Sequence, residues 1–387
     1  MDREYEEMEN NNLEEALKFY FKGVNLKDVL YDEDNDYSYA DNIFGGSILA
    51  TGYSSEFREV PNIGKMIRLM VLHYFKMINP DYDFKSLKKG KLYEEEMSES
   101  MNNSSPYFKL IFKYLKLDKE LQNLIVDYRT WGLSQSDLDQ VAIATMKRYQ
   151  DQDEESLKRI WAFYKTNSKL KDKTRSGWDS THWNIKGRRE TVSEHIVGTL
   201  LLHTALSSDF NYNFNIDNVY QVLALHEVGE SLIGDITPFD GITPEEKQAI
   251  EHKAMEDSIG ALFLKDYYLR LLFEFDKQKK KKMKYAHFID KIEADLTSKR
   301  YQDKGLQHEL TDQSENVVMK SSKVQDMIAS GAKTPFDIWY LWDKGIYEGD
   351  KDFPEFAEIL NIVNYIDINN IEHSLYKEEI KKRKLEK

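Results

Sequence analysis

The most restrictive feature of the sequence is a group of acidic and imidazole side chains set in an apolar stretch. Residues 224–238 contain His226, Glu227, Glu230 and Asp235. Their apolar neighbours predict burial, and burying several charged groups is costly unless they are paired or coordinate a metal. The apolar residues 219–225 favour a buried helix, on which His226 and Glu230 would share one face because they are four residues apart. We expect Gly234 to end this helix and Asp235 to lie on the next loop. The alternative is a buried histidine bonded to a neighbouring glutamate.

A second histidine lies upstream, within another predicted helix. His195 sits among apolar residues spaced with a helical period over residues 192–201. Arg188 and Arg189 precede this helix, and guanidinium groups suit the geometry of a phosphate. The alternatives are a core histidine and a solvated pair of surface arginines.

A third predicted helix, residues 285–296, carries Asp290 within its apolar face. This carboxylate needs a partner, which could also be a salt bridge to Lys291. Taken together, the three helices offer two histidines and several carboxylates, a mixed nitrogen and oxygen set that suits a divalent transition metal. A metal lowers the pKa of bound water, Arg188 would hold a phosphate, and a spare carboxylate would move protons. The pattern therefore predicts metal-assisted hydrolysis of a phosphate ester.

The order of these residues resembles a known family. His195, then His226 with Glu227, then Asp290 is similar to the HD-domain metal-dependent phosphohydrolases. Further motifs at Thr174–Trp178, Glu190–His195, Gly234–Lys247 and Glu251–Met255 narrow the resemblance to the HD-domain 5′-deoxynucleotidases. That group includes the bacterial YfbR-like enzymes and the eukaryotic HD-domain-containing protein 2 group. The resemblance runs from about residue 157 to about residue 303.

The resemblance implies a role for each matching residue. The ligands of one divalent metal ion (Mn, Co, Mg, Fe or Zn) would be His195, His226, Glu227 and Asp290. Glu230 and Asp235 would orient water and move protons, Arg188 would lie near the substrate, and Arg175 and Trp178 would contact the nucleotide and check its sugar. The implied reaction converts deoxynucleoside 5′-monophosphates to deoxynucleosides and phosphate, and the implied assembly is a homodimer. Glu227 departs from the family, which has aspartate there, and residues 179–186 form an insertion.

Alternative functions stay open on the same residues. The chain could be an HD phosphohydrolase for another nucleotide, such as a triphosphate, a modified nucleotide or a cyclic nucleotide. Because Glu227 replaces the usual aspartate, it could also be a regulatory or binding module with a degenerate HD site.

Composition limits the partners and the compartment. With 54 basic and 68 acidic residues the net charge is −14, so we expect no binding to nucleic acid. The chain has no cysteine, which excludes disulfides and favours a reducing compartment. The longest apolar run, residues 196–206, is too short to cross a membrane. We expect a cytoplasmic protein that binds a small nucleotide and no membrane.

The fold class expected from these patterns is all-α, with an HD-type helical bundle over residues 151–387. Residues 1–150 are interpreted as an α-rich accessory region, which contains a predicted helix over residues 63–74. A further helix is predicted to start after Ser136 as its N-cap. The stretch Gly45–Gly52 lacks the lysine of a phosphate-binding loop, so we interpret it as a turn. Thr243 is predicted to cap a helix that begins at Pro244.

Overall fold

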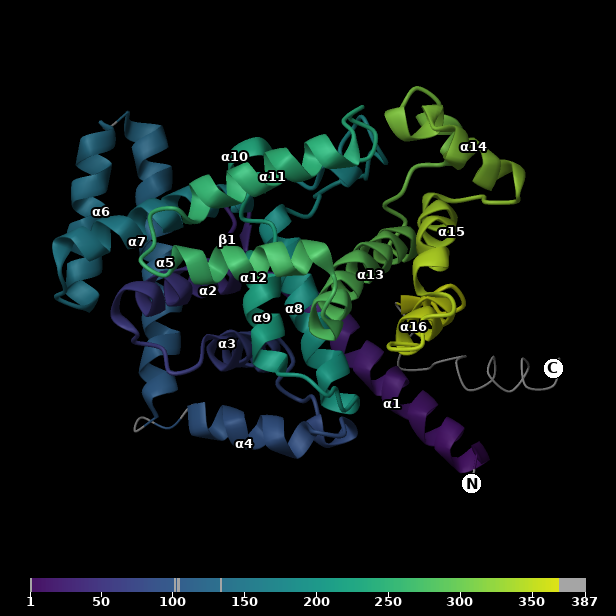
Figure 1. Cartoon of the computed structure of the whole chain (residues 1–387), viewed down its shortest axis with the longest axis horizontal. Coiled ribbons are helices and arrows are strands. Elements are labelled where there is room, and N and C mark those ends of the chain that lie inside the picture. The colour runs from purple at the N-terminus through teal and green to yellow at the C-terminus, as the bar shows by residue number, and fades with distance from the viewer. Residues whose placement is uncertain (1, 101, 103–104, 133, 369–387) are drawn as a thin grey trace.

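A computed structural model of the chain describes residues 2–100, 102, 105–132 and 134–368, and its regular structure is mainly helical (Figure 1). Within these ranges the only sheet is an antiparallel hairpin of β1 (Leu30–Asp32) and β2 (Tyr37–Ser38). The prediction of an all-α fold is therefore confirmed. Residues 369–387, the end of the predicted HD-type segment, lie outside the described residues.

The first part of the chain forms α1 (Asp2–Gly23), η1 (Val24–Lys27), α2 (Tyr39–Phe57), α3 (Ile63–Ile78), η2 (Phe84–Ser86), α4 (Gly90–Ser100), α5 (Pro106–Trp131) and α6 (Gln135–Tyr149), in which η marks a short 3-10 helix. The predicted helix over residues 63–74 is confirmed as α3. The prediction that Ser136 caps the last of these helices is wrong. Ser134 is the N-cap of α6 and accepts a hydrogen bond from the amide of Asp137, because the same serine-to-aspartate spacing occurs two residues earlier.

The second part forms α7 (Glu154–Asn167), η3 (Ser168–Lys171), η4 (Ser176–Trp178), α8 (Val192–Asp209), α9 (Ile216–Leu225), α10 (Glu230–Ile233), α11 (Pro244–Ile259), α12 (Lys265–Lys277), α13 (Lys281–Asp303), η5 (Leu310–Gln313), η6 (Val317–Lys320), α14 (Ser322–Ala329), α15 (Pro335–Tyr347) and α16 (Glu355–Val363). Thr243 caps α11 as predicted, and Glu246 completes a capping box with it. An equivalent box at Thr191 and Glu194 fixes the start of α8.

The glycine-rich stretch Gly45–Gly52 is helical, so its interpretation as a turn is wrong. It lies inside α2, and its small residues let this helix approach its neighbours closely. A Cβ atom added at Gly45 would lie 1.7 Å from Oδ1 of Asp118 on α5, and one added at Gly46 would lie 2.9 Å from Leu115. Close packing against α5, rather than backbone reversal, accounts for Gly45 and Gly46, and Gly52 packs in the same way against Ile160 of the later helix over residues 154–167.

One apolar core joins the two parts of the chain. It extends from Leu13 on α1 to Ile366 beyond α16, and α8 is buried along its whole length. α8 packs against α1, α2, α9 and α13, so helices from both parts surround it (Figure 1). A partly buried ion pair also joins the two parts, with Nη1 of Arg68 on α3 lying 2.6 Å from Oδ1 of Asp217 on α9. The boundary at residue 150 stays a prediction, and the apolar core runs across it. No helix in the described part of the chain combines the length and apolarity that a membrane span requires.

Candidate metal centre

His195 is held between two carboxylates of α13. It lies in the first turns of α8, where its side chain is fully buried. Its Nδ1 lies 2.6 Å from Oε2 of Glu293, and its Nε2 lies 3.0 Å from Oδ1 of Asp290. Asp290 and Glu293 are three residues apart on α13, so they share the face that meets α8. The imidazole is therefore fixed in orientation from both of its nitrogens.

His226 stands at the end of a helix rather than inside one. The prediction that His226 and Glu230 share one helical face is wrong, because α9 ends at Leu225 and Glu230 begins the separate helix α10. The chain turns over residues 226–229, where Gly229 approaches α11 so closely that an added Cβ would lie 3.3 Å from the carbonyl of Glu251. Because of this break, Glu230 lies on α10 and not on a continuation of the helix that precedes His226.

The free nitrogen of His226 has the chemistry of a metal ligand. Its Nδ1 lies 2.8 Å from the carbonyl oxygen of Leu223. A carbonyl only accepts, so Nδ1 carries a proton and Nε2 of the neutral ring keeps its lone pair. Nε2 is buried and has no hydrogen-bond partner among the described residues, although Oδ1 of Asp290 is 3.4 Å away. A buried polar atom left in this state is costly, and a bound cation would satisfy it.

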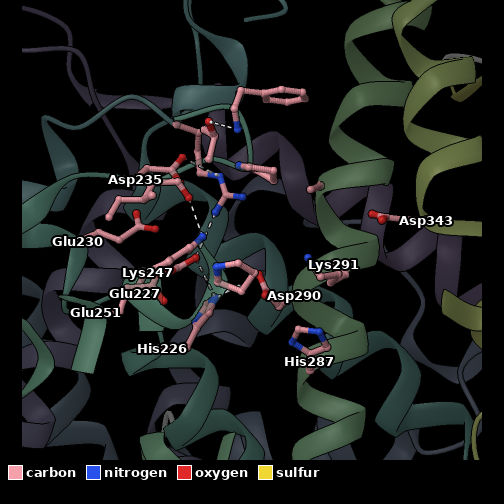
Figure 2. A pocket seen from close by; sticks show the side chains of 18 of the residues that line it. His226, Glu227, Glu230, Asp235, Lys247, Glu251, His287, Asp290, Lys291 and Asp343 are labelled. Carbon is pink, nitrogen blue, oxygen red and sulfur yellow. Dashed lines mark hydrogen bonds and ion pairs between the residues drawn. The ribbon is translucent and has the colours of Figure 1, made fainter. Parts of the chain in front are cut away.

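Four side chains converge around this nitrogen. His195, His226, Glu227 and Asp290 each offer one ligand atom, and these atoms lie within 4.8 Å of one another. Figure 2 shows His226, Glu227 and Asp290 turned toward one another across the pocket. Two imidazoles with two carboxylates suit Zn, Mn, Fe or Co. The residues present therefore fit a divalent metal ion, and they are the four that the sequence suggested.

Protons occupy this site when no metal is bound. Burial and nearby Arg175 lower the pKa of His195, but the hydrogen bonds to Asp290 and Glu293 raise it to about 9. Burial raises the pKa of Asp290, yet the two imidazoles lower it well below its usual range. The metal-free centre is thus an imidazolium between carboxylates at neutral pH.

Glu230, Asp235 and Arg175 line the same pocket. One carboxylate oxygen of Glu230 is buried with no hydrogen-bond partner among the described residues. Burial, Glu227 and Asp235 together raise the pKa of Glu230 well above its usual range. Gly234, with a φ of 87°, ends α10 as predicted. Asp235 follows it, and the Asp235 carboxylate accepts a hydrogen bond of 2.8 Å from the amide of Ser176. Nη1 of Arg175 lies 3.3 Å from Oε1 of Glu227 and leaves its other nitrogens near the pocket.

The pocket has a volume of about 450 Å³ and two kinds of lining side chain. His226 and several carboxylates form one kind. Aromatic side chains form much of the rest of its lining, namely Trp183, Phe239, Phe275, Trp339 and Trp342. Lys247 and Lys291 add positive charge, and Figure 2 shows Lys291 next to Asp290 on α13, with Asp343 on the neighbouring helix α15. The pocket can thus accept a molecule with a charged end and a flat apolar end.

Arg188 and Trp178 do not line this pocket. The guanidinium of Arg188 donates to both oxygens of Glu194, at 2.7 and 3.1 Å, and to Asp36 at 2.8 Å. It thereby braces the start of α8. Trp178 is buried, and its Nε1 donates to Oε1 of Glu190 at 2.8 Å. The substrate contacts that the resemblance implies for these two residues remain predictions.

Several pocket and network residues escaped the sequence reasoning. Trp339, Trp342 and Asp343 lie on α15, and they reach the site only through the packing of α13 against α15. Glu293 had a usable signal, since it follows Asp290 at helical spacing within the segment already singled out.

Comparison with known proteins places this site in a family. The family described as the HD domain matches residues 167–330, which include all four candidate ligands. Residues 167–330, less than half of the chain, are thus similar to an HD domain. HD domains of this kind are phosphohydrolase domains.

Curated relatives are similar to part of this chain. The human 5′-deoxynucleotidase HDDC2 is 29% identical over 144 residues, which are 36% of this chain and 67% of the relative. The Dictyostelium discoideum protein of the same name is 31% identical over 105 residues, covering 26% of this chain and 54% of that protein. The 5′-deoxynucleotidase hdd1 of Schizosaccharomyces pombe is 28% identical over 132 residues, covering 33% and 64%. Residues 1–150 lie outside the matched HD domain.

Proposed function

We propose that this protein is a divalent-metal-dependent phosphohydrolase that converts (deoxy)nucleoside 5′-monophosphates to nucleosides and phosphate. The observation that carries the proposal is the convergence of His195, His226, Glu227 and Asp290 around a buried imidazole nitrogen with no hydrogen-bond partner among the described residues. Its setting in a pocket that is also lined by aromatic side chains favours a substrate with a phosphate and a base.

The four converging side chains would hold the metal ion. When bound, the ion would supply a water of lowered pKa and positive charge for the phosphate. Glu227 is one methylene longer than the usual aspartate, and its Oε1 lies 3.7 Å from Nε2 of His226. That distance is compatible with both atoms contacting one ion, so the glutamate supports a working site.

The remaining pocket residues bind and orient the substrate. Arg175 and Lys291 would carry the phosphate contacts, because both line the pocket close to the carboxylate cluster. Arg188 is left out of this role since its guanidinium is engaged by Glu194 and Asp36. Glu230 and Asp235 face the same end of the pocket and would orient the attacking water and move its proton. Trp339 and Trp342 offer flat surfaces for the base.

The relatives support the substrate class. The similar proteins from human and from Schizosaccharomyces pombe are both named 5′-deoxynucleotidases. The finer choice among deoxy and ribo sugars and among bases is open to direct test.

The decisive experiment is phosphate release from a panel of ribo- and deoxynucleoside mono- and triphosphates. The protein is stripped of metal and then supplied with Mn²⁺, Co²⁺, Mg²⁺ or Zn²⁺. We expect metal-dependent release from monophosphates, and its loss in His226→Ala. His252→Ala is the matched control, because His252 pairs with Asp276 outside the cluster. Release from triphosphates alone would redirect the proposal to another nucleotide. No release and no metal binding would leave a degenerate regulatory module.

A further inference from the structure

A buried polar network lies behind His195, on the side away from the pocket. Oε2 of Glu293 contacts Nδ1 of His195, and its other oxygen, Oε1, accepts hydrogen bonds from Nζ of Lys27 at 2.6 Å and from the hydroxyl of Tyr20 at 2.9 Å. Nζ of Lys27 also donates to Oε2 of Glu190 at 2.8 Å. Lys27 and Tyr20 belong to the first part of the chain, on η1 and α1.

The ammonium of Lys27 balances two buried carboxylates. The side chains of Lys27, Glu190 and Glu293 are only 2%, 2% and 0% exposed. Ligand atoms of Glu190, His195 and Glu293 lie within 4.8 Å of one another, an arrangement that could itself hold a cation. Lys27 donates to both glutamates and is that cation. Removing one partner from such a buried group is far more costly than removing a surface ion pair.

The packing of α8 leaves room for this contact. Gly198 lies one turn after His195, and a Cβ atom added there would lie 2.0 Å from Oε1 of Glu293 and 2.6 Å from Nζ of Lys27. Any other residue would displace the ammonium or the carboxylate. The missing side chain at Gly198 on α8 therefore leaves the space in which Lys27 contacts Glu293.

We propose that Lys27 is a positioning residue of the metal centre, acting through Glu293 on His195. Lys27 holds Glu293 against Nδ1, and Glu293 in turn keeps that nitrogen protonated and turns Nε2 toward Asp290 and the metal. Partners of this kind orient metal ligands, and losing one weakens metal binding by about 10–100-fold. The inference rests on the proposed metal site, and it makes residues 1–150 a part of that site.

Loss of the ammonium has a direct electrostatic consequence. Glu190 and Glu293 would then face each other in the interior with no cation between them. Their repulsion would shift Glu293 from its present position, because Glu190 is held by Trp178 and Glu293 is held on the lysine side by hydroxyl groups alone. His195 would lose the fixed orientation that presents Nε2 to the site.

The test measures binding of Co²⁺ alone to the full-length, metal-stripped protein, by titration and by the visible spectrum of the bound ion. Lys27→Met should weaken binding by about 10–100-fold and change the spectrum. In Lys27→Met/Glu190→Gln the charge balance of the network returns, so affinity should recover in part. Tyr20→Phe removes one hydroxyl at little change in volume and should give a smaller loss.

Lys171→Met is the matched control. Lys171 forms an equally buried ion pair, with Nζ 2.7 Å from Oδ1 of Asp118 and both side chains 0% exposed, but it touches none of the candidate ligands. It should lose stability yet retain Co²⁺ affinity. A second readout needs no metal: the proton between His195 and Glu293 should give a low-field proton NMR signal that Lys27→Met loses and Lys171→Met keeps.

The outcomes separate the two proposals. If the unaltered protein binds no Co²⁺, the metal site itself is wrong. If it binds Co²⁺ and folded Lys27→Met keeps the same affinity, spectrum and low-field signal, Lys27 has no positioning role while the metal site stands. Should Lys27→Met fail to fold, Tyr20→Phe decides: unchanged Co²⁺ affinity and an unchanged low-field signal in folded Tyr20→Phe would overturn the inference.

Discussion

Replacing Asp290 by asparagine tests the metal centre with the smallest change of shape. Oδ1 of Asp290 lies 3.0 Å from Nε2 of His195 and 3.4 Å from Nε2 of His226, so a single oxygen faces both imidazoles. Asparagine keeps the side-chain volume but loses the charge. We therefore expect Asp290→Asn to fold and to bind metal poorly.

The size of the effect follows from the number of ligands. A four-ligand zinc site has a binding free energy of about 10–16 kcal/mol near neutral pH, so one ligand of the four accounts for about 3 kcal/mol. A tenfold change in affinity corresponds to about 1.4 kcal/mol. Asp290→Asn should thus weaken Zn²⁺ binding by about 100-fold, since the asparagine oxygen still offers a weak contact.

The assay is competition for Zn²⁺ between the metal-stripped protein and a fluorescent chelator, with circular dichroism to verify the fold. Asp276→Asn is the control, because Asp276 lines the same pocket but pairs with His252 outside the cluster. Its affinity for Zn²⁺ should not change. Wild-type affinity in a folded Asp290→Asn variant would refute the assignment of Asp290 as a ligand.

Three further predictions concern His195, Glu230 and Gly45. The pKa of His195 is raised from 6.5 to about 9, so its contribution to the stability of the metal-free protein is complete below about pH 6.5 and is lost as the pH rises through about 9. Thermal melts across this range should show the loss in the native protein and not in His195→Gln, whereas Zn²⁺ affinity should rise with pH because the metal competes with that proton. Glu230→Gln should keep the metal and lower kcat by about 10²–10⁴-fold, and unchanged turnover would leave Glu230 without its role. Gly45→Ala would place a Cβ 1.7 Å from Asp118 and should destabilise the fold by about 1–3 kcal/mol in urea unfolding, a value near zero contradicting the close approach of α2 to α5.

Local sequence patterns predicted the helical fold and the meeting of His195, His226 and Asp290. The helical period of apolar residues and the capping boxes are local signals, so α3, α8 and α11 were readable. Patterns whose meaning depends on a neighbouring helix cannot be interpreted from the local sequence. Glycines in α2 signal close packing against α5 rather than a turn, and only the partner helix distinguishes the two cases.

The candidate site also combines features that the local sequence indicates with features that depend on packing. The i, i+4 spacing of His226 and Glu230 suggested one helix, but the break at residues 226–229 depends on how Gly229 packs against α11. The partner of Arg188 is only six residues away, at Glu194. The sequence alone does not distinguish an arginine that binds phosphate from one that stabilises the start of a helix. Lys27 lies more than 160 residues from Glu190 along the chain, and no local pattern could have joined them.

The continuous core that links Leu13 to Ile366 sets how the molecule behaves when its chain is cut. The segment between α6 and α7, residues 150–153, is non-helical and largely exposed, so a protease can reach it. Cleavage there would sever the backbone while the helices on either side of the cut stayed packed around α8. The nicked protein would migrate as two fragments in denaturing gels but as one species in native ones, and it would lose its metal centre only when the fragments were pulled apart.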